Sequence, residues 1–241
     1  MTTLGIIQAR IGSTRLPGKV LRQLGGRTVL GRVVHAVRSS GVVDDLVVAT
    51  TTEAVDDAVE AECMALGVAC YRGSVDDVLG RFLDVLEMHE SDTVLRFTAD
   101  SPMLDPQLVA MAARVFAAAG VDYLSTSLAH TLPRGLDVEV VRTPVLKAID
   151  GLATDHHRTH VTSYIYTHAD DFDVIGLTLQ PDLSHLRLTL DTEDDWKLIE
   201  AIVDHFGDQP VDVRALTDWL AGQPDLVLLN AHVEQKTLVQ A

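Results

Sequence analysis

Short apolar runs alternate with amphipathic stretches along the first half of the chain. Four runs have the length and composition of buried strands, at residues 4–9, 46–50, 68–71 and 93–98. In the segments between them, apolar residues recur at helical spacing, at residues 29–37, 55–66 and 75–86. Asp105 followed by Pro106 is a strong signal for the start of a further helix. Such strand–helix repeats require parallel strands joined by right-handed crossovers, so the pattern predicts a three-layer αβα fold.

The pattern changes after Gly120. Residues 136–141 alternate acidic and apolar side chains as a half-exposed strand does, whereas residues 154–168 are polar, rich in histidine and expected to be helical. Further strands are expected at residues 172–179 and 186–190, and a late helix around residues 196–206. We interpret residues 125–185 as an excursion from the core sheet. Because no linker or repeat is visible, residues 1–241 are expected to form a single domain.

Composition narrows the classes of partner. The 241 residues are 47% hydrophobic, enough for a sizeable core, and their 19 Lys and Arg against 35 Asp and Glu give a net charge of −16. A surface this acidic repels nucleic acid and anionic lipid, so neither is expected as a partner. No apolar run reaches membrane-spanning length and no secretion signal is visible, which predicts a soluble, cytoplasmic protein. Cys63 and Cys70 lack metal-ligand spacing and are expected to be buried free thiols.

The segment from Gln8 to Lys19 carries the clearest chemical signal. It leaves the first strand as a loop with three cations, two glycines and two hydroxyl residues in ten positions. Glycines let the backbone approach a ligand closely, and cations attract oxyanions. The loop therefore predicts a polyphosphate cradle, and hence nucleotide chemistry; a solvated basic turn is the alternative. It matches neither G-x-G-x-x-G nor G-x-x-x-x-G-K-[ST], which disfavours a dinucleotide enzyme or a P-loop NTPase.

Acidic residues follow predicted strands at two further points. Ligands of open α/β sheets bind beyond the carboxyl ends of the strands, where residues 50–53, 99–102 and 190–195 are expected to lie. Two carboxylates that converge on a triphosphate from separate strand ends are a usual way to hold Mg²⁺. Asp100 and Asp191 are the candidates. The alternative is that each acid only caps a helix, Asp191 serving the helix near Trp196.

Several motifs resemble those of one enzyme family. The opening segment, IIQARIGSTRLPGKVL over residues 6–21, is similar to the start of the SpsF-like cytidylyltransferases of spore coat polysaccharide synthesis. These are relatives of the acylneuraminate and 3-deoxy-manno-octulosonate cytidylyltransferases. Further matching motifs are VVATTT at 47–52, RGSVDDVLGR at 72–81, PRGLDVE at 133–139, HVTSYIY at 160–166 and DLSHLR at 182–187. The resemblance covers about residues 4–206 in order and spacing.

This resemblance implies a Rossmann-like, GT-A-type nucleotidyltransferase fold with a mostly parallel mixed sheet, CTP as donor, Mg²⁺ as cofactor and a homodimer. It assigns nucleotide binding to Gln8, Ala9, Arg10, Gly12, Ser13, Thr50, Thr51, Arg72 and Asp76. It assigns catalysis to Arg15, Lys19 and Asp100, the metal to Asp100 and Asp191, and acceptor binding to Arg134, Asp137, Glu139, His160, Tyr164 and Arg187. Residues 125–185 would then serve acceptor recognition or dimer contacts. Ala99 departs from the family's glycine, so packing around the nucleotide is expected to differ.

The implied reaction needs no covalent nucleophile. An oxygen of a sugar, sugar acid or phosphonate attacks the α-phosphorus of CTP in line and pyrophosphate leaves, so positioning and electrostatics are the main catalytic effects. Three other functions stay open: use of another nucleoside triphosphate, a GT-A glycosyltransferase, and a nucleotide-sensing scaffold. A glycosyltransferase would favour an Asp-x-Asp metal motif, which occurs here only in the acidic run at residues 171–173.

Two candidate residues also have a second interpretation. In this second interpretation, Arg187 pairs with neighbouring acids and does not bind substrate. His160 is then a structural or dimer-contact histidine and not a substrate ligand. His156 and His160 would share a helical face, the spacing of some zinc pairs, but the sequence suggests no third ligand.

Overall fold

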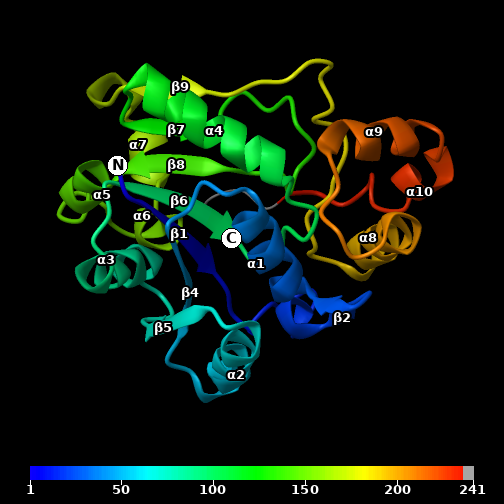
Figure 1. The fold of residues 1–241 in the computed structure, drawn as a ribbon, viewed down its shortest axis with the longest axis horizontal. Coiled ribbons are helices and arrows are strands. Elements are labelled where there is room, and N and C mark those ends of the chain that lie inside the picture. Colours follow the sequence, from blue (N-terminus) through cyan, green and yellow to red (C-terminus); the bar gives the residue numbers. More distant parts are fainter. Residues whose placement is uncertain (236–241) are drawn as a thin grey trace.

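A seven-stranded sheet forms the middle of three layers in the computed structural model, which describes residues 1–235 (Figure 1). Its spatial order is β5–β4–β1–β6–β8–β7–β9. The strands are β1 (Thr3–Gln8), β4 (Asp45–Thr51), β5 (Ala69–Gly73), β6 (Thr93–Thr98), β7 (Tyr123–Ser125), β8 (Glu139–Arg142) and β9 (Val174–Gly176). Strands β5, β4, β1 and β6 are parallel, whereas β8 runs antiparallel to both β6 and β7. The expected mostly parallel mixed sheet is therefore confirmed.

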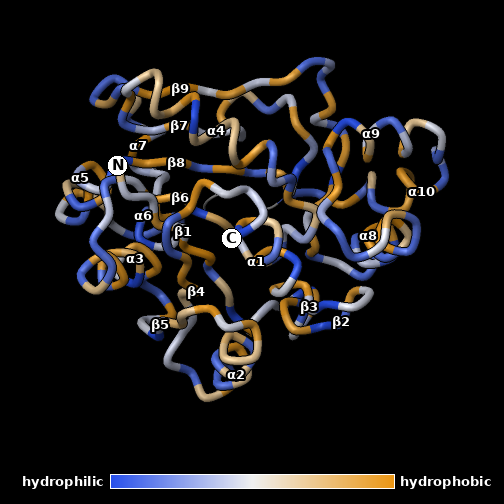
Figure 2. Tube along the Cα trace, viewed as in Figure 1, coloured by the Kyte–Doolittle hydropathy of each residue, from blue (hydrophilic) through white to orange (hydrophobic). Residues whose placement is uncertain are grey.

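Helices cover both faces of this sheet. One face packs against α1 (Val29–Ser39), α2 (Asp57–Leu66), α4 (Pro106–Ala119), α8 (Glu193–Phe206) and α9 (Val213–Ala221). The other packs against α3 (Val78–Met88), α5 (Thr143–Ala148) and α7 (Ser163–Thr167). Successive strand residues divide between the two layers, Ile7 facing the first and Ile6 the second. Figure 2 shows the resulting apolar strands at the centre of the molecule.

Short elements complete the described chain. They are the hairpin strands β2 (Gln23–Leu24) and β3 (Arg27–Thr28), the helices α6 (His156–Thr159) and α10 (Pro224–Leu228), and the 3-10 turns η1 (Lys19–Leu21), η2 (Ala54–Asp56) and η3 (Ala169–Asp171). Helix α10 packs beside α8 and α9, so the C-terminal helices form one group at the side of the sheet (Figure 1). No helix among residues 1–235 is long and apolar enough to cross a membrane.

The helix signals in the first half of the sequence are confirmed with small shifts. The Asp105 carboxylate accepts the amide of Gln107 at 2.7 Å and so caps α4. Gly67 ends α2 in the left-handed conformation, at φ 60°. Helix α3 starts at Val78, three residues later than its apolar pattern begins, because the Asp77 side chain caps it. Cys63 is buried as expected, whereas Cys70 is only half-buried; neither forms a disulfide.

Predictions for the second half are less accurate. The expected half-exposed strand at residues 136–141 starts only at Glu139 and is covered on both faces, which leaves Glu139 8% exposed. The expected helix at residues 154–168 is broken into α6 and α7 around Val161, whose φ is 48°. His160 is the C-terminal cap of α6, and its amide donates to the His156 carbonyl at 2.9 Å, so these two histidines lie one helical turn apart as expected.

Two further strand predictions change in extent. The strand expected at residues 172–179 shortens to β9, and residues 186–190 make only an isolated bridge, between Arg187 and Arg134. Strands β8 and β9 both join the main sheet. The interpretation of residues 125–185 as an excursion from the core sheet is therefore wrong for β8 and β9, whereas most of the rest of this segment lies outside the sheet.

Candidate active site

Four parallel strands end at one edge of the sheet, and the predicted site gathers there. Asp100 follows the end of β6, next to β1, which leads into the loop at residues 9–18. The segment before α8 reaches the same edge, because the Leu190 amide donates to the carbonyl of Asp100 at 2.9 Å. Asp100 and Asp191 are thereby brought together although 91 positions separate them in the sequence.

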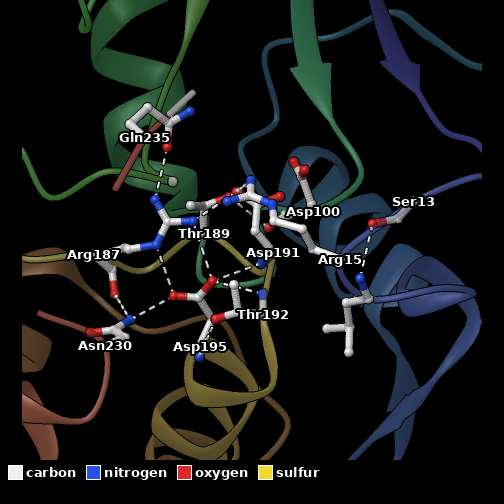
Figure 3. Close-up of polar contacts among 12 residues, drawn as sticks. Ser13, Arg15, Asp100, Arg187, Thr189, Asp191, Thr192, Asp195, Asn230 and Gln235 are labelled. Carbon is white, nitrogen blue, oxygen red and sulfur yellow. Dashed lines mark hydrogen bonds and ion pairs between the residues drawn. The ribbon is translucent and has the colours of Figure 1, made fainter. Parts of the chain in front are cut away.

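The ammonium of Lys19 lies between these two acids. Its Nζ is 2.7 Å from Asp100 Oδ2 and 2.8 Å from Asp191 Oδ1. Arg15 reaches the same place, with Nη2 3.0 Å from Asp191 Oδ2 (Figure 3). The loop cations and the acids Asp100 and Asp191 therefore occupy one cluster, as the sequence predicts, although within residues 1–235 no strand directly precedes Asp191.

Internal hydrogen bonds shape the loop that carries these cations. The Ile11 carbonyl accepts the amides of Ser13 at 2.7 Å and Gly18 at 3.2 Å, which closes the loop on itself. Gly18 has φ 69°, a conformation that favours glycine, and it directs the chain into η1 with Lys19 at its start. The Ile11 amide donates to Asp56 Oδ1 at 2.7 Å, so the loop is also fixed to the segment after β4.

The charges in this cluster stabilise one another. Burial lowers the pKa of Lys19, but attraction to Asp100 and Asp191 outweighs burial and leaves that pKa above its ordinary value. Burial alone would raise the pKa of Asp191, yet Lys19, Arg15 and Arg187 together hold it below its ordinary value. Lys19 and Asp191 are therefore both charged at neutral pH.

The two acids fit a divalent cation. Carboxylate oxygens are the ligands that Mg²⁺ prefers in proteins, and a cation bound to both acids would take the place that the Lys19 ammonium holds between them. Asp191 is not the cap of the following helix, because Thr192 and Asp195 form that capping box. The alternative role of Asp191 as a cap is wrong, and its side chain instead pairs with Lys19, Arg15 and Arg187.

The remaining loop residues offer groups suited to phosphate. Among residues 1–235, the Arg10 guanidinium is exposed and forms no ion pair. Gly12 is exposed, and a Cβ there would meet nothing within 4 Å. The Ser13 hydroxyl accepts the Leu16 amide at 3.3 Å, which helps to shape the loop. The nucleotide-binding roles of these residues stay predictions.

The base-side candidates lie at the ends of β1 and β4. Ala9 donates its amide to the Ala49 carbonyl at 3.1 Å, and Gln8 Oε1 accepts from the Arg96 guanidinium. Thr51 donates to the Asp56 carboxylate. The hydroxyl of Thr50 is buried and has no hydrogen-bond partner among the described residues. An orphaned buried hydroxyl at this edge is consistent with a site that a ligand completes.

Arg72 and Asp76 are less directly placed for a nucleotide. Arg72 donates to the carbonyls of Thr51 and Glu53 and pairs with Asp57 and Glu60, so all its guanidinium nitrogens contact protein. It therefore supports the end of β4 through protein contacts. Asp76 is exposed in the loop before α3.

Four acceptor candidates remain accessible. Within the described residues, the half-buried Arg134 forms no ion pair. Tyr164 stacks on His168 with ring centroids 4.0 Å apart. His160 is half-buried after α6, and Asp137 is half-buried with a pKa that burial raises. Their acceptor-binding roles stay predictions.

The other two acceptor candidates are occupied by protein partners. Glu139 pairs with Arg96 and accepts the hydroxyls of Thr162 and Tyr123, the latter at 3.0 Å. Arg187 is 5% exposed and pairs with Asp191 and Asp195, as its second interpretation held. Contrary to expectation, neither side chain faces an open acceptor site.

Loss of the Glu139 carboxylate should destabilise the fold. We expect Glu139→Ala to lower the free energy of unfolding by about 3 kcal/mol, because it leaves the Arg96 charge buried without its partner. Urea denaturation measures the change. Glu193→Ala is the matched control, since its ion pair with Arg22 lies at the surface and should contribute at most about 1 kcal/mol. Equal losses in the two variants would contradict a structural role for Glu139.

Several residues that support the site lie in no sequence motif that predicts their role. Asp56 fixes the loop and Thr51, Arg96 joins Gln8 to Glu139, and Asn230 contacts Asp195. Only Asp195 carried a signal, because it stands three residues after Thr192 in the spacing of a capping box.

The fold and this cluster define an α/β nucleotidyltransferase. The family model described as "Cytidylyltransferase" matches residues 4–212. The spore coat polysaccharide biosynthesis protein SpsF of Bacillus subtilis is 38% identical over 231 residues, which cover 92% of this chain and 95% of that protein. A cytidylyltransferase structure from Leptospira borgpetersenii superposes with a TM-score of 0.91 at 27% identity, covering 98% and 99% of the two chains.

A more distant structure shares the fold. It is CMP:2-keto-3-deoxy-manno-octonic acid synthetase complexed with CTP, with a TM-score of 0.62, 18% identity and coverage of 85% of this chain and 99% of that one. The match to the family model and to SpsF is decisive at the level of sequence. The chain belongs to the cytidylyltransferase family.

Proposed function

We propose that this protein transfers CMP from CTP to an oxygen of a sugar, sugar acid or phosphonate and releases pyrophosphate. The observation that carries the proposal is the contact of Lys19 and Arg15 with the acids at the same sheet edge. Family membership supports cytidylyl transfer as the reaction. The distant synthetase solved with CTP supports CTP as the donor.

The cluster provides charge complementarity for a triphosphate. Asp100 and Asp191 would hold Mg²⁺, which when bound neutralises phosphate charge. Lys19 and Arg15 stabilise the negative charge that develops on the leaving pyrophosphate, Lys19 as a point charge and Arg15 through two parallel donors. Lys19 is 7% exposed and lies between the two acids, so its ammonium would shift toward the phosphates when Mg²⁺ binds to those acids.

The acceptor and the assembly complete the proposal. Arg134 carries a charge suited to a carboxylate or phosphonate, and Asp137, His160 and Tyr164 supply polar groups for hydroxyls. We propose that residues 125–185 bind the acceptor and contribute to a homodimer within a single-domain chain. We place the reaction in the cytoplasm, because that is where a CTP-dependent enzyme finds its donor.

A matrix of nucleotides and acceptors tests this function. CTP, UTP, ATP and GTP are each incubated with Mg²⁺ and with sugars, sugar acids or phosphonates, and pyrophosphate release is measured. We expect release with CTP and one acceptor class, and little without acceptor. Release with another nucleotide alone would reassign the donor. Two added assays separate the alternatives: turnover when a nucleotide sugar replaces the triphosphate would identify a glycosyltransferase, and CTP binding in calorimetry without turnover would identify a sensor.

A further inference from the structure

A buried polar network lies directly behind Asp191 (Figure 3). Its members are Arg187, Asp195 and Asn230, which are 5%, 0% and 2% exposed. They are close to substrate-binding groups but turned away from solvent. A charged network this deep is costly unless every group is paired.

Asp195 is paired completely. Its Oδ1 accepts Arg187 Nε at 2.8 Å and Asn230 Nδ2 at 2.8 Å. Its Oδ2 accepts the backbone amides of Asp191 and Thr192, each at 2.9 Å, and Arg187 Nη2 at 3.2 Å. One carboxylate thus fixes both the Arg187 side chain and the backbone of Asp191.

Arg187 extends this constraint to the side chain of Asp191. Its Nη2 lies 2.7 Å from Asp191 Oδ2, the oxygen that also pairs with Arg15. The other oxygen, Oδ1, pairs with Lys19. The orientation of the Asp191 carboxylate is therefore set from behind by Arg187 and from the front by the loop cations.

Asn230 supports the network from a distant part of the chain. It lies after α10, beyond residue 212 where the family match ends. Its amide donates to Asp195 Oδ1 and to the Arg187 carbonyl at 3.0 Å. A neutral amide satisfies these two oxygens without adding a charge to a network that already holds one cation between two acids.

We propose that Asp195 and Asn230 are positioning residues that hold Asp191 in the orientation needed to bind a divalent cation. The inference rests on the proposed function for the identity of Asp191 as a metal ligand. Neither residue touches the substrate; each acts through Arg187 or the Asp191 backbone. The C-terminal segment that carries Asn230 is therefore part of the active-site support.

The direct test is Mn²⁺ binding to the nucleotide-free protein, measured by electron paramagnetic resonance. Asn230→Ala should weaken Mn²⁺ binding by up to about tenfold, the lower end of the effect of losing a partner bonded to a metal ligand, because Asn230 acts on Asp191 only through Asp195 and Arg187. Leu226→Ala is the matched control, because Leu226 packs on the same core from α10 and its side chain takes no part in the network. The control should stay within about twofold of the parent protein.

Steady-state kinetics separate positioning from a merely structural role. In Asn230→Ala, the Mg²⁺ concentration for half-maximal activity should rise by up to about tenfold, and saturating Mg²⁺ should restore most of kcat. Asp195→Asn should show an effect at least as large, and circular dichroism establishes that each variant is folded. If Asp195→Asn fails to fold, Asn230→Ala alone decides.

Two results would overturn the inference. One is equal Mn²⁺ affinity in Asn230→Ala, the control and the parent protein. The other is Mn²⁺ binding that Asp191→Asn leaves unchanged, which would show that Asp191 is not a metal ligand. Failure of the proposed function is distinct, because it would appear as no pyrophosphate release while the Mn²⁺ affinities still differed.

Discussion

Replacement of Lys19 by alanine is expected to lower kcat for pyrophosphate release by about 10³-fold. Among residues 1–235, Lys19 brings the one ammonium that contacts both Asp100 and Asp191, so its loss removes charge from the place where the pyrophosphate is proposed to leave. The protein should remain folded, because Arg15 and Arg187 still pair with Asp191. Stopped assays of pyrophosphate at saturating CTP and acceptor measure the change.

Two further variants make the Lys19 result specific. Lys19→Arg keeps the charge but not the compact ammonium geometry, and should recover part of the activity. Lys197→Ala removes a surface lysine whose ion pair within the described part of the chain is with Asp194, and should leave kcat unchanged. Near-normal turnover in folded Lys19→Ala would show that Lys19 does not stabilise the transition state.

Asp100→Asn is expected to have the second large effect, a loss of about 10³-fold in turnover at ordinary Mg²⁺ concentrations. The amide is nearly isosteric but carries no charge, so it weakens a divalent cation site built from two carboxylates. Mn²⁺ binding to the free protein should weaken in parallel. Asp218→Asn makes the same exchange on the exposed side of α9 and should change neither quantity.

An Asp100→Asn protein with normal Mn²⁺ affinity but no turnover would assign Asp100 to substrate rather than metal. Normal Mn²⁺ affinity together with normal turnover in Asp100→Asn would show that Asp100 has no role in the site. The two readouts therefore distinguish the proposed metal ligand from a residue that only pairs with Lys19.

Most of the central cluster was predictable because the loop with Lys19 and the acid Asp100 each follow a strand. The apolar runs before Gln8 and before Asp100 identify parallel strands, and parallel strands place their carboxyl ends at one edge. The composition of the loop after β1 then predicts that positive charge lies at this edge. The parallel direction of the strands was therefore sufficient to predict that Lys19 and Asp100 lie close together.

The supporting contacts could not be predicted in this way. Glu139 looks like an exposed acid in an alternating pattern, but its partner Arg96 lies 43 positions earlier and is brought beside it by antiparallel pairing of β6 and β8. Arg187 precedes Asp191 by only four positions, yet Asn230, 43 positions later, helps to fix its surroundings. Such pairs depend on tertiary packing, which residue periodicity does not encode.

The break at Val161 is a similar case. Residues 154–168 are polar and were expected to form one helix. Val161 instead adopts φ 48° and is fully buried among the apolar residues that cover the second face of the sheet. Burial of this valine against the core overrides the local helical tendency. The histidines on either side consequently belong to different elements, which sequence spacing alone places on one helix.

A crystal structure with CTP and Mn²⁺ tests the central claim most directly. We expect an anomalous peak within about 2.5 Å of carboxylate oxygens from both Asp100 and Asp191, with Lys19 and Arg15 contacting the triphosphate. A metal bound elsewhere, or a triphosphate outside reach of both cations, would contradict the account.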